Sequence, residues 1–538
     1  MGYGVNQKDV ESNNNLIDEI LANDLFVTLL HWDLPQALDD YYGGFLLPKI
    51  VIWCTLIHFY TFALIRLKEQ HLKTAGGLPY GIPSPINILV FYLYNFAIII
   101  IIFQKKIRDH SNGDVADDFY HRYKEDIALV KSTGFDAFRF SISWSRVIPK
   151  GKISYGVNQK GVEFYNNLID EILANGLKPY VTLFHWDLPQ ALDDYYGGFL
   201  SPKIVDDYVD YADFCFRTFG DRVKNWFTLN EPYEYSVYGY ATDVYPPGRC
   251  SSYIGNCTAG NSATEPYIVG HHLILSHAAA VKLYREKYKH SQKGEIGIAL
   301  SSWWYVPISQ NKSSQVAAMR GLDFRLGWFL HPLTYGDYPR IMKKLLRSRL
   351  PRFLKADREI LMRSYDFVGI NYYTSKYAAN RKFCNTVNLT VTTDNCVLES
   401  VEKNGVPIGQ PTGFSTLYSY PKGIEALMIY VKDYYGNPPI YITENGYAQA
   451  NNNTLPVAEL LKDEARIVFH HDHLFYLSKA IKEGARVKGY FMWSFLDDYE
   501  WDVGYTVRFG TILIDYKDGL KRYPKDSALW FKKFLQKS

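Results

Sequence analysis

The chain has 538 residues, of which 47% are hydrophobic, and its formal net charge is +3. This length suits one large barrel or several ordinary domains with a sizeable core. Lysine and arginine are spread along the sequence without a basic stripe that alternates with aromatic residues, so we expect no nucleic-acid partner.

The chain opens with a repeat. Residues 3–46 and 155–199 are almost identical, and both contain NNLIDEILAN followed by HWDLPQALDDYYGGF. Repeat architectures need three or more copies at regular spacing. Two copies instead indicate a recent duplication or a wrongly assembled gene.

A strongly apolar stretch follows at 51–107. Its run INILVFYLYNFAIIIIIF, residues 86–103, has the minimum length of a membrane-spanning helix. It lies too far from the start for an ordinary signal peptide. A membrane span and a translated intron-like sequence are both open interpretations. We therefore expect residues 1–107 to be an aberrant N-terminal segment and residues 108–538 to be the barrel domain.

From residue 108 onward, short β-branched and aromatic runs alternate with amphipathic helical stretches. This alternation predicts an α/β fold with a parallel sheet and right-handed crossovers. Polar and aromatic residues end each run, as in barrels that carry their sites at the carboxyl ends of the strands. Seven strands are expected, at 135–144, 178–186, 223–231, 295–306, 367–374, 439–446 and 487–495.

The predicted architecture is a (β/α)8 barrel whose first strand is missing or replaced. Seven strands would leave unpaired edges, which a closed barrel does not have. One candidate replacement is the duplicated string LFVTLLHW, residues 25–32, which would then pair with residues 135–144.

Two glutamates end predicted strands: Glu231 in FTLNEP and Glu444 in YITENG. Cleavage of a glycosidic bond needs two carboxyl groups. One donates a proton and, in retaining enzymes, the other attacks, with the two carboxyl groups about 5 Å apart. A barrel would bring these two residues together. Taken alone, a glutamate at a strand end equally suits a helix cap or an ion pair.

Further motifs accompany these glutamates: RFSISWSRVIP, HWDLPQAL, GYATDVYPPGRC, GINYYTS and FMWSFLDDYEWDVGYTVRFG. From about residue 108 to the end, the set resembles glycoside hydrolase family 1 in its plant branch, which includes cyanogenic β-glucosidases. The resemblance implies a retaining β-glucosidase that uses no cofactor or metal. Its substrate would be a small-molecule β-glucoside, hydrolysed by double displacement through a covalent glucosyl-enzyme.

The resemblance also implies roles for individual residues. Glu231 would be the acid/base and Glu444 the nucleophile. Arg139 would lie against Glu444, Tyr373 would hydrogen-bond to it, and Asn230 would hold the sugar 2-hydroxyl. The remaining sugar-binding residues would be His185, Trp186, Asn371, Trp493, Glu500 and Trp501.

Three departures from the family leave alternatives open. The first-strand motif with its sugar-binding Gln is absent from residues 1–107, Asp243 stands where Gly is usual, and Thr416 replaces an aglycone-stacking Trp. The alternatives are a transglucosylase with the same machinery, a catalytically impaired product, and a membrane-tethered protein that uses residues 86–103.

Cysteines and sequons bear on the compartment. Cys250 with Cys257, and Cys384 with Cys396, have spacings that suit short disulfide loops, whereas Cys54 and Cys215 are expected to be buried thiols. Together with the sequons at Asn256, Asn311, Asn388 and Asn452, these pairs favour the secretory pathway, with a vacuolar or extracellular destination. A homo-oligomer stays open.

Overall fold

The computed structural model describes residues 27–28 and 106–536. Cys54, the apolar run at 86–103 and most of the duplicated copy at 3–46 lie outside the described residues. The described residues belong to two compact units. The larger unit holds 27–28, 117–498 and 507–536, and the smaller one holds 106–116 and 499–506.

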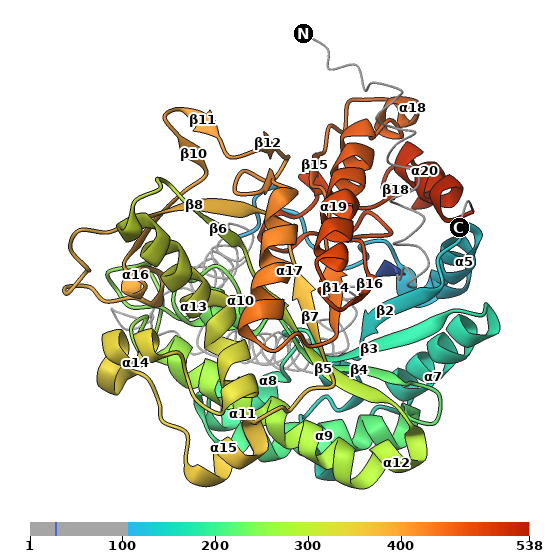
Figure 1. Ribbon diagram of the computed structural model, residues 1–538. Helices are drawn as coiled ribbons and strands as arrows, with labels where there is room; N and C mark the ends of the chain where they lie inside the picture. The colour runs from blue at the N-terminus through green and yellow to red at the C-terminus, as the bar shows by residue number, and fades with distance from the viewer. Residues whose placement is uncertain (1–26, 29–105, 537–538) are drawn as a thin grey trace, which may run out of the picture. The chain divides into compact units, whose positions relative to one another are not determined.

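The larger unit is built on eight parallel strands in the order β1-β2-β3-β4-β5-β7-β14-β16 (Figure 1). All seven predicted strands are present, and the eighth lies beside the first of them. Their bounds are β1 Val27–Thr28, β2 Ala137–Ser141, β3 Lys178–Phe184, β4 Asn225–Asn230, β5 Glu295–Ser301, β7 Phe367–Asn371, β14 Ile440–Glu444 and β16 Val487–Tyr490.

Long helices separate these strands and surround them in Figure 1. Helix α7 shows why: Phe164, Leu168 and Ile172 recur every four residues, so one face of the helix is apolar and all three are buried. The strand and helix order confirms the predicted (β/α)8 barrel fold. The separating helices are α5 Phe119–Ser132, α7 Gln159–Ala174, α9 Lys203–Phe219, α11 Glu265–Leu283, α13 Lys312–Tyr335, α17 Lys422–Tyr434 and α19 Glu464–Lys482.

Strand β1 comes from the duplicated segment at the start of the chain. Val27 pairs with Phe138 and Thr28 pairs with Arg139, so these two residues lie parallel to β2. The equivalent residues of the second copy, Val181 and Thr182, belong to β3 on the other side of β2. The first strand is therefore replaced rather than missing.

A layer of five aromatic side chains and two alanines fills the centre of the barrel. It takes one residue from each of β2, β3, β4, β5, β7 and β14 and one from just after β16: Ala137, Tyr180, Phe227, Ala299, Phe367, Tyr441 and Phe491. The rings of Tyr180 and Phe491 meet edge to face, 5.0 Å apart between centroids. This layer closes the barrel beneath the strand ends that carry the polar side chains.

The predicted strand 295–306 is wrong as one element. Strand β5 ends at Ser301, and Trp304–Pro307 forms β6 in a separate sheet with β8 Ser375–Asn380 and β9 Val397–Ser400. The break follows from long-range pairing: Ser302 N–H still donates to the Asn371 carbonyl, whereas Trp304 pairs with Ser375 of β8.

Shorter elements connect the barrel units. The helices are α6 Trp144–Val147, α8 Gln190–Tyr196, α10 Pro232–Tyr240, α12 Lys289–Gln292, α14 Arg340–Leu346, α15 Lys355–Leu361, α16 Val391–Asp394, α18 Val457–Leu460 and α20 Asp526–Leu535. Antiparallel pairs join β10 Glu402–Lys403 to β11 Val406–Pro407, β12 Gln410–Pro411 to β13 Tyr418–Ser419, β15 Gln449–Ala450 to β17 Val507–Arg508, and β18 Ile512–Asp515 to β19 Lys521–Pro524.

In the smaller unit, two segments that are distant in the sequence bind each other. Arg108 N–H donates to the Asp502 carbonyl at 2.7 Å, and the Asp109 carboxylate accepts from Tyr505 N–H at 2.8 Å. This unit contains Glu500 and Trp501.

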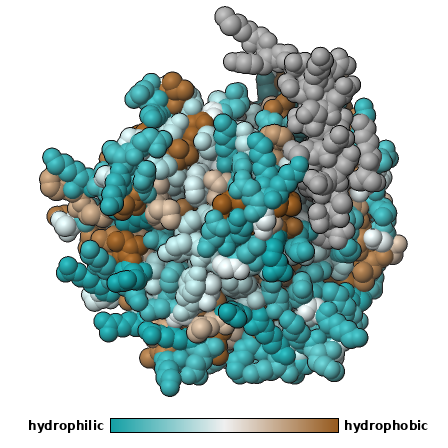
Figure 2. All heavy atoms as spheres, viewed as in Figure 1, coloured by the Kyte–Doolittle hydropathy of each residue, from teal (hydrophilic) through white to brown (hydrophobic). Residues whose placement is uncertain are grey.

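Both predicted disulfide loops are closed in the structure. Cys250 bonds to Cys257 and Cys384 to Cys396, with Cα atoms 5.5 and 5.1 Å apart, and Cys215 is a buried thiol. On the face seen in Figure 2, polar side chains predominate and hydrophobic residues lie in small patches between them. None of the helices within residues 106–536 combines the length and hydrophobicity needed to cross a membrane.

Candidate active site

Polar side chains gather at the carboxyl ends of three strands of the barrel. Asn230 ends β4, Asn371 ends β7 and Glu444 ends β14, while Glu231 follows Asn230 directly. The pairing register shifts just before the end of β4 and of β14. Such irregularities turn side chains away from the regular alternation of a strand. The carboxyl ends of the barrel strands thus gather both glutamates that were predicted from sequence.

Glu444 is buried, with 4% of its surface exposed. Arg139 of β2 donates from Nη1 to Oε1 of Glu444 at 3.1 Å, and the Tyr373 hydroxyl donates to Oε2 at 2.8 Å. The Arg139 side chain is fully buried and also donates to the Thr443 carbonyl. Both carboxylate oxygens of Glu444 therefore accept a hydrogen bond, and one of them lies directly against the positively charged guanidinium of Arg139.

Glu231 has a different environment. It precedes helix α10 in a left-handed backbone conformation, with φ of 43°, and its N–H donates to the Ala299 carbonyl. The Asn371 amide donates to its Oε1 at 2.8 Å, and no guanidinium or ammonium donor within the described residues bonds to the carboxyl. This left-handed conformation is uncommon for a residue other than glycine and costs about 1–3 kcal/mol, as often found at functional sites.

These surroundings separate the two carboxyls electrostatically. Burial raises the pKa of Glu231 well above its ordinary value, and the nearby carboxylates of Glu234 and Glu444 raise it further. Burial also raises the pKa of Glu444, but there Arg139 and Tyr373 lower it. The pKa of both carboxyls is raised, but Glu231, beside two other carboxylates, favours the protonated form more strongly, and Glu444, beside Arg139 and Tyr373, favours the anion more strongly.

Asn230 connects the two sides of the site. Its side-chain oxygen accepts from Arg139 at 2.7 Å, and its amide nitrogen lies 3.1 Å from His185 Nε2. The Trp186 indole donates to the Asn230 backbone carbonyl at 2.8 Å. Burial, followed by the charge of Arg139, lowers the pKa of His185 well below its ordinary value, so the imidazole is neutral. His185 and Trp186 thus lie beside Asn230, at the end of β3.

Trp493 is buried after β16, and its backbone N–H donates to the Asn445 carbonyl, next to Glu444. A Cβ at Gly446 would lie 1.9 Å from the Trp493 carbonyl oxygen, so glycine is required for this close approach.

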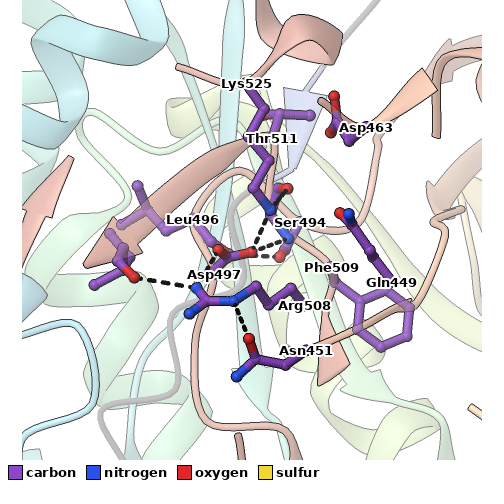
Figure 3. A network of polar contacts seen from close by, with 12 residues as sticks. Gln449, Asn451, Asp463, Ser494, Leu496, Asp497, Arg508, Phe509, Thr511 and Lys525 are labelled. Atoms are coloured by element: carbon purple, nitrogen blue, oxygen red, sulfur yellow. Dashed lines mark hydrogen bonds and ion pairs between the residues drawn. The ribbon is translucent and has the colours of Figure 1, made fainter. Parts of the chain in front are cut away.

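A buried polar network, which sequence reasoning missed, holds the segment after Trp493 (Figure 3). Asp497 accepts from Arg508 at 2.6 Å and from Lys525 at 2.7 Å, and it also accepts from Gly510 N–H. Burial raises the pKa of Asp497, but Lys525 and Arg508 bring it below its ordinary value. Because Asp497 lies four residues after Trp493, the network fixes the chain that carries the indole. Its members are far apart in the sequence, so no local pattern signals them.

Glu500 and Trp501 lie in the smaller unit, where Glu500 N–H donates to the Gly504 carbonyl at 2.9 Å. Their predicted sugar-binding roles stay predictions. Thr416 is exposed, and Asp243 adopts a left-handed backbone conformation with φ of 62°.

A second charged pair lies beside Glu231 and was also missed. Glu234, one turn further along α10, binds the guanidinium of Arg325 from α13, and both side chains are buried. Arg325 in turn lies 3.7 Å from the centroid of the Trp303 ring. In the sequence, Glu234 stands three residues after Glu231 within NEPYEY, but nothing there identifies a partner nearly a hundred residues away.

The arrangement can carry out acid–base and nucleophilic chemistry on one bound atom. It offers a protonated carboxyl, an anionic carboxylate and, between them, the Asn371 amide, which bonds to Glu231 and contributes a hydrogen bond at Glu444. Over the described part of the chain, no group of three or more His, Cys, Asp or Glu side chains is arranged to hold a metal ion.

Comparison with known proteins gives the family. A model described as "Glycosyl hydrolase family 1" matches residues 1–68 and 100–538. Beta-glucosidase 12 of Oryza sativa subsp. indica is 54% identical over 434 residues, which cover 80% of this chain and 85% of that protein. Furcatin hydrolase of Viburnum furcatum is 55% identical over 435 residues, covering 81% of this chain and 80% of that protein.

Solved structures agree with these relatives. A mutant of the rice β-glucosidase Os3BGlu6 in a covalent complex with Glc has a TM-score of 0.79 and 49% identity, covering 80% of this chain and 90% of that chain. A β-glucosidase from the fungus Humicola insolens in complex with glucose has a TM-score of 0.77 and 38% identity, covering 80% of this chain and 90% of that one.

Proposed function

The chain belongs to glycosyl hydrolase family 1 and is a retaining β-glucosidase, and we propose that Glu231 is its acid/base and Glu444 its nucleophile. The observation that carries this assignment is the contrast between the two carboxyls. Glu444 is held by Arg139 and Tyr373, whereas Glu231 accepts from the neutral Asn371 amide and from no charged donor among the residues that the structure describes. Cleavage with retention needs one anionic and one protonated carboxyl on either side of the anomeric carbon.

In the first step, a carboxylate oxygen of Glu444 attacks the anomeric carbon of a β-glucoside. The bond between that carbon and the leaving oxygen breaks, and the Glu231 proton moves to this oxygen. The product is a covalent α-glucosyl ester on Glu444 together with the released alcohol. Arg139 stays beside Glu444, where its charge stabilises the carboxylate before the attack and again when the ester breaks.

In the second step, Glu231 is an anion and takes a proton from a water molecule. The water oxygen bonds to the anomeric carbon, the ester bond to Glu444 breaks, and β-glucose leaves. Glu231 is then protonated again and Glu444 is again a carboxylate. One residue therefore acts first as acid and then as base.

The remaining predicted residues have positions that support sugar binding. Asn230 and His185 are polar and lie beside Arg139, which suits hydrogen bonds to sugar hydroxyls, including the 2-hydroxyl at Asn230. Trp493 offers an apolar ring next to the loop of Glu444, which suits the C–H face of a glucose ring. Trp186 and Asn371 would position these groups through the bonds described above.

The substrate is a small-molecule glycoside. For the compartment, we infer entry into the secretory pathway, followed by a vacuolar or extracellular destination. Two disulfides support this, as do sequon asparagines 256, 311, 388 and 452, all of which are exposed. The barrel domain would begin near residue 108, with Val27–Thr28 added from the segment before it.

A trapping experiment tests the catalytic assignment. A 2-deoxy-2-fluoro-β-glucoside with a dinitrophenolate leaving group should form the covalent intermediate faster than it is hydrolysed, because the fluorine slows both steps and the good leaving group restores the first. Peptide mass spectrometry should find one fluoroglucosyl group on the peptide that contains Glu444. A label on another carboxyl, or an α-glucose first product seen by NMR with an ordinary substrate, would overturn the assignment.

A further inference from the structure

A buried ion pair between Glu234 and Arg325 lies close enough to the proposed acid/base, Glu231, to interact with it electrostatically. Glu234 lies in the first turn of α10, three residues after Glu231, and its carboxylate interacts electrostatically with that of Glu231. Glu234 is 8% exposed and Arg325 is 3% exposed. Arg325 Nη2 donates to one carboxylate oxygen of Glu234, and the Ser301 hydroxyl donates to the other.

Aromatic rings and a second ion pair surround Arg325. Its guanidinium lies 3.7 Å from the Trp303 ring centroid and 4.4 Å from that of Tyr233. The Lys376 ammonium lies 3.5 Å from the Trp303 centroid and 3.3 Å from Glu399. Two acidic and two basic side chains thus gather around one indole. Of these four side chains, Glu234 and Arg325 interact electrostatically with Glu231.

This arrangement is costly for stability alone. Within the described residues, Nε and Nη1 of Arg325 are buried without a hydrogen-bond partner. Replacing a buried ion pair by apolar side chains of similar volume is often neutral or stabilising. A charged pair that is retained beside a catalytic carboxyl is therefore a candidate for a role in the chemistry.

We propose that Glu234 and Arg325 are positioning residues for Glu231, whose paired charges fix the electrostatic field in which this carboxyl carries its proton. The inference rests on the proposed acid/base role of Glu231. Neither residue needs to touch the substrate, because both act through space on a carboxyl in the same buried region.

The charges that face Glu231 come from four elements. Glu234 of α10 and Glu444 of β14 raise its pKa beyond the effect of burial, and Arg325 of α13 lowers it. Arg139 of β2 also interacts with Glu231, and the neutral Asn371 of β7 donates to it. Glu234 and Arg325 act in opposite directions, so the two single variants should move the proton affinity of Glu231 in opposite directions.

The test is the pH dependence of kcat/KM, whose alkaline limb reports the acid of the free enzyme. In Glu234→Gln, a negative charge is lost and Arg325 stays, so the limb should move down by roughly one pH unit. In Arg325→Met, the negative charge of Glu234 is no longer compensated, so the alkaline limb of kcat/KM should move to higher pH. The double variant restores neutrality, and its limb should return toward that of the parent.

Substrate choice and a matched control separate this role from a structural one. The shifts should appear with 4-nitrophenyl β-glucoside and shrink with 2,4-dinitrophenyl β-glucoside, whose leaving group needs little protonation. Asp126→Asn breaks another buried pair, with Arg522, and should lower thermal stability without moving the limb.

Each outcome decides the matter. Opposite shifts in the two single variants support the proposal, and so do shifts in the double variant that cancel. Folded single variants whose limbs coincide with that of the parent overturn it, while leaving the function of Glu231 intact. If Glu231→Gln itself keeps the parent profile, the proposed acid/base fails instead.

Discussion

The hydroxyl of Tyr373 donates a hydrogen bond to Oε2 of Glu444 across 2.8 Å, while Arg139 holds the other carboxylate oxygen. The phenol is a neutral donor and stabilises only the anionic form of the carboxylate. It therefore contributes to the negative charge that the nucleophile needs before it attacks.

Removing this donor should weaken the nucleophile at low pH. We expect Tyr373→Phe to raise the pKa of Glu444, move the acidic limb of kcat/KM to higher pH, and lower kcat/KM by about 10- to 100-fold. Tyr372→Phe is the matched control, because the Tyr372 hydroxyl donates to the Tyr420 carbonyl instead. An acidic limb that moves equally in both variants would contradict the assignment.

Exogenous azide should distinguish the roles of the two glutamates. Glu444→Ala should lose several powers of ten in activity, and azide in the vacated space should give α-glucosyl azide in one displacement. Glu231→Ala should still form the glucosyl-enzyme from a dinitrophenyl glucoside, and azide should then give β-glucosyl azide. NMR of the products reads the configuration, and the reverse pairing would exchange the two roles.

The buried network around Asp497 should be a major source of stability. Lys525 and Asp497 are both fully buried, and burial lowers the pKa of Lys525 to about 8. Lys525→Met leaves part of the Asp497 charge unpaired, which should cost about 3 kcal/mol of unfolding free energy. It should also raise KM, because the segment after Trp493 loses its anchor.

The control for that experiment is Lys521→Met. Lys521 pairs with Asp518 at 2.6 Å on an exposed surface, where solvent screens the charges and such pairs contribute little to stability. Thermal unfolding and KM for 4-nitrophenyl β-glucoside should distinguish the two variants. Equal melting temperatures would show that the network does not stabilise the fold.

Buried histidines should make the protein sensitive to acid. Burial lowers the pKa of His271 and His473 to about 4 and that of His277 to about 3. Their ordinary value is about 6.5, so the unfolded chain binds protons first as pH falls. Their contribution to stability is complete above about pH 6.5 and is lost as pH falls from there toward about 4 for His271 and His473 and toward about 3 for His277.

A single variant isolates this effect. The His473 ring packs 3.9 Å from that of Phe469, so phenylalanine fits a site that is already aromatic. Between about pH 7 and pH 4, the melting temperature of His473→Phe should fall by less than that of the parent protein. Parallel curves for the two proteins would show that His473 does not titrate during acid unfolding.

The backbone pairing of β1 with β2 should be needed for folding. Proline at both positions, Val27→Pro with Thr28→Pro, removes two backbone N–H groups and should expose the edge of β2. We expect loss of soluble, active protein. The control Val27→Thr with Thr28→Val keeps two β-branched residues and should express normally. Normal activity of the proline variant would mean that this strand is dispensable.

The sequence was sufficient for the barrel because its signals are local. Each strand is a short apolar run, and each helix, such as α7, repeats its apolar residues every three or four positions. The barrel topology is also enough to expect Glu231 and Glu444 at the same end of the barrel, although β5 and β7 lie between their strands. The break at Ser302 and the partners of Glu234 and Asp497 depend on pairing between distant segments, which periodicity cannot reveal.

The shared sequence of β1 and β3 has a consequence for how the chain reaches its native state. Both edges of β2 accept the same Val-Thr dipeptide, from residues 27–28 on one side and 181–182 on the other. During folding, two nearly identical segments therefore compete for each edge. A molecule in which residues 27–28 and 181–182 occupy each other's edge of β2 must separate these strands again before it can reach the native fold. The duplication that completes the sheet therefore also makes a misfolded intermediate available.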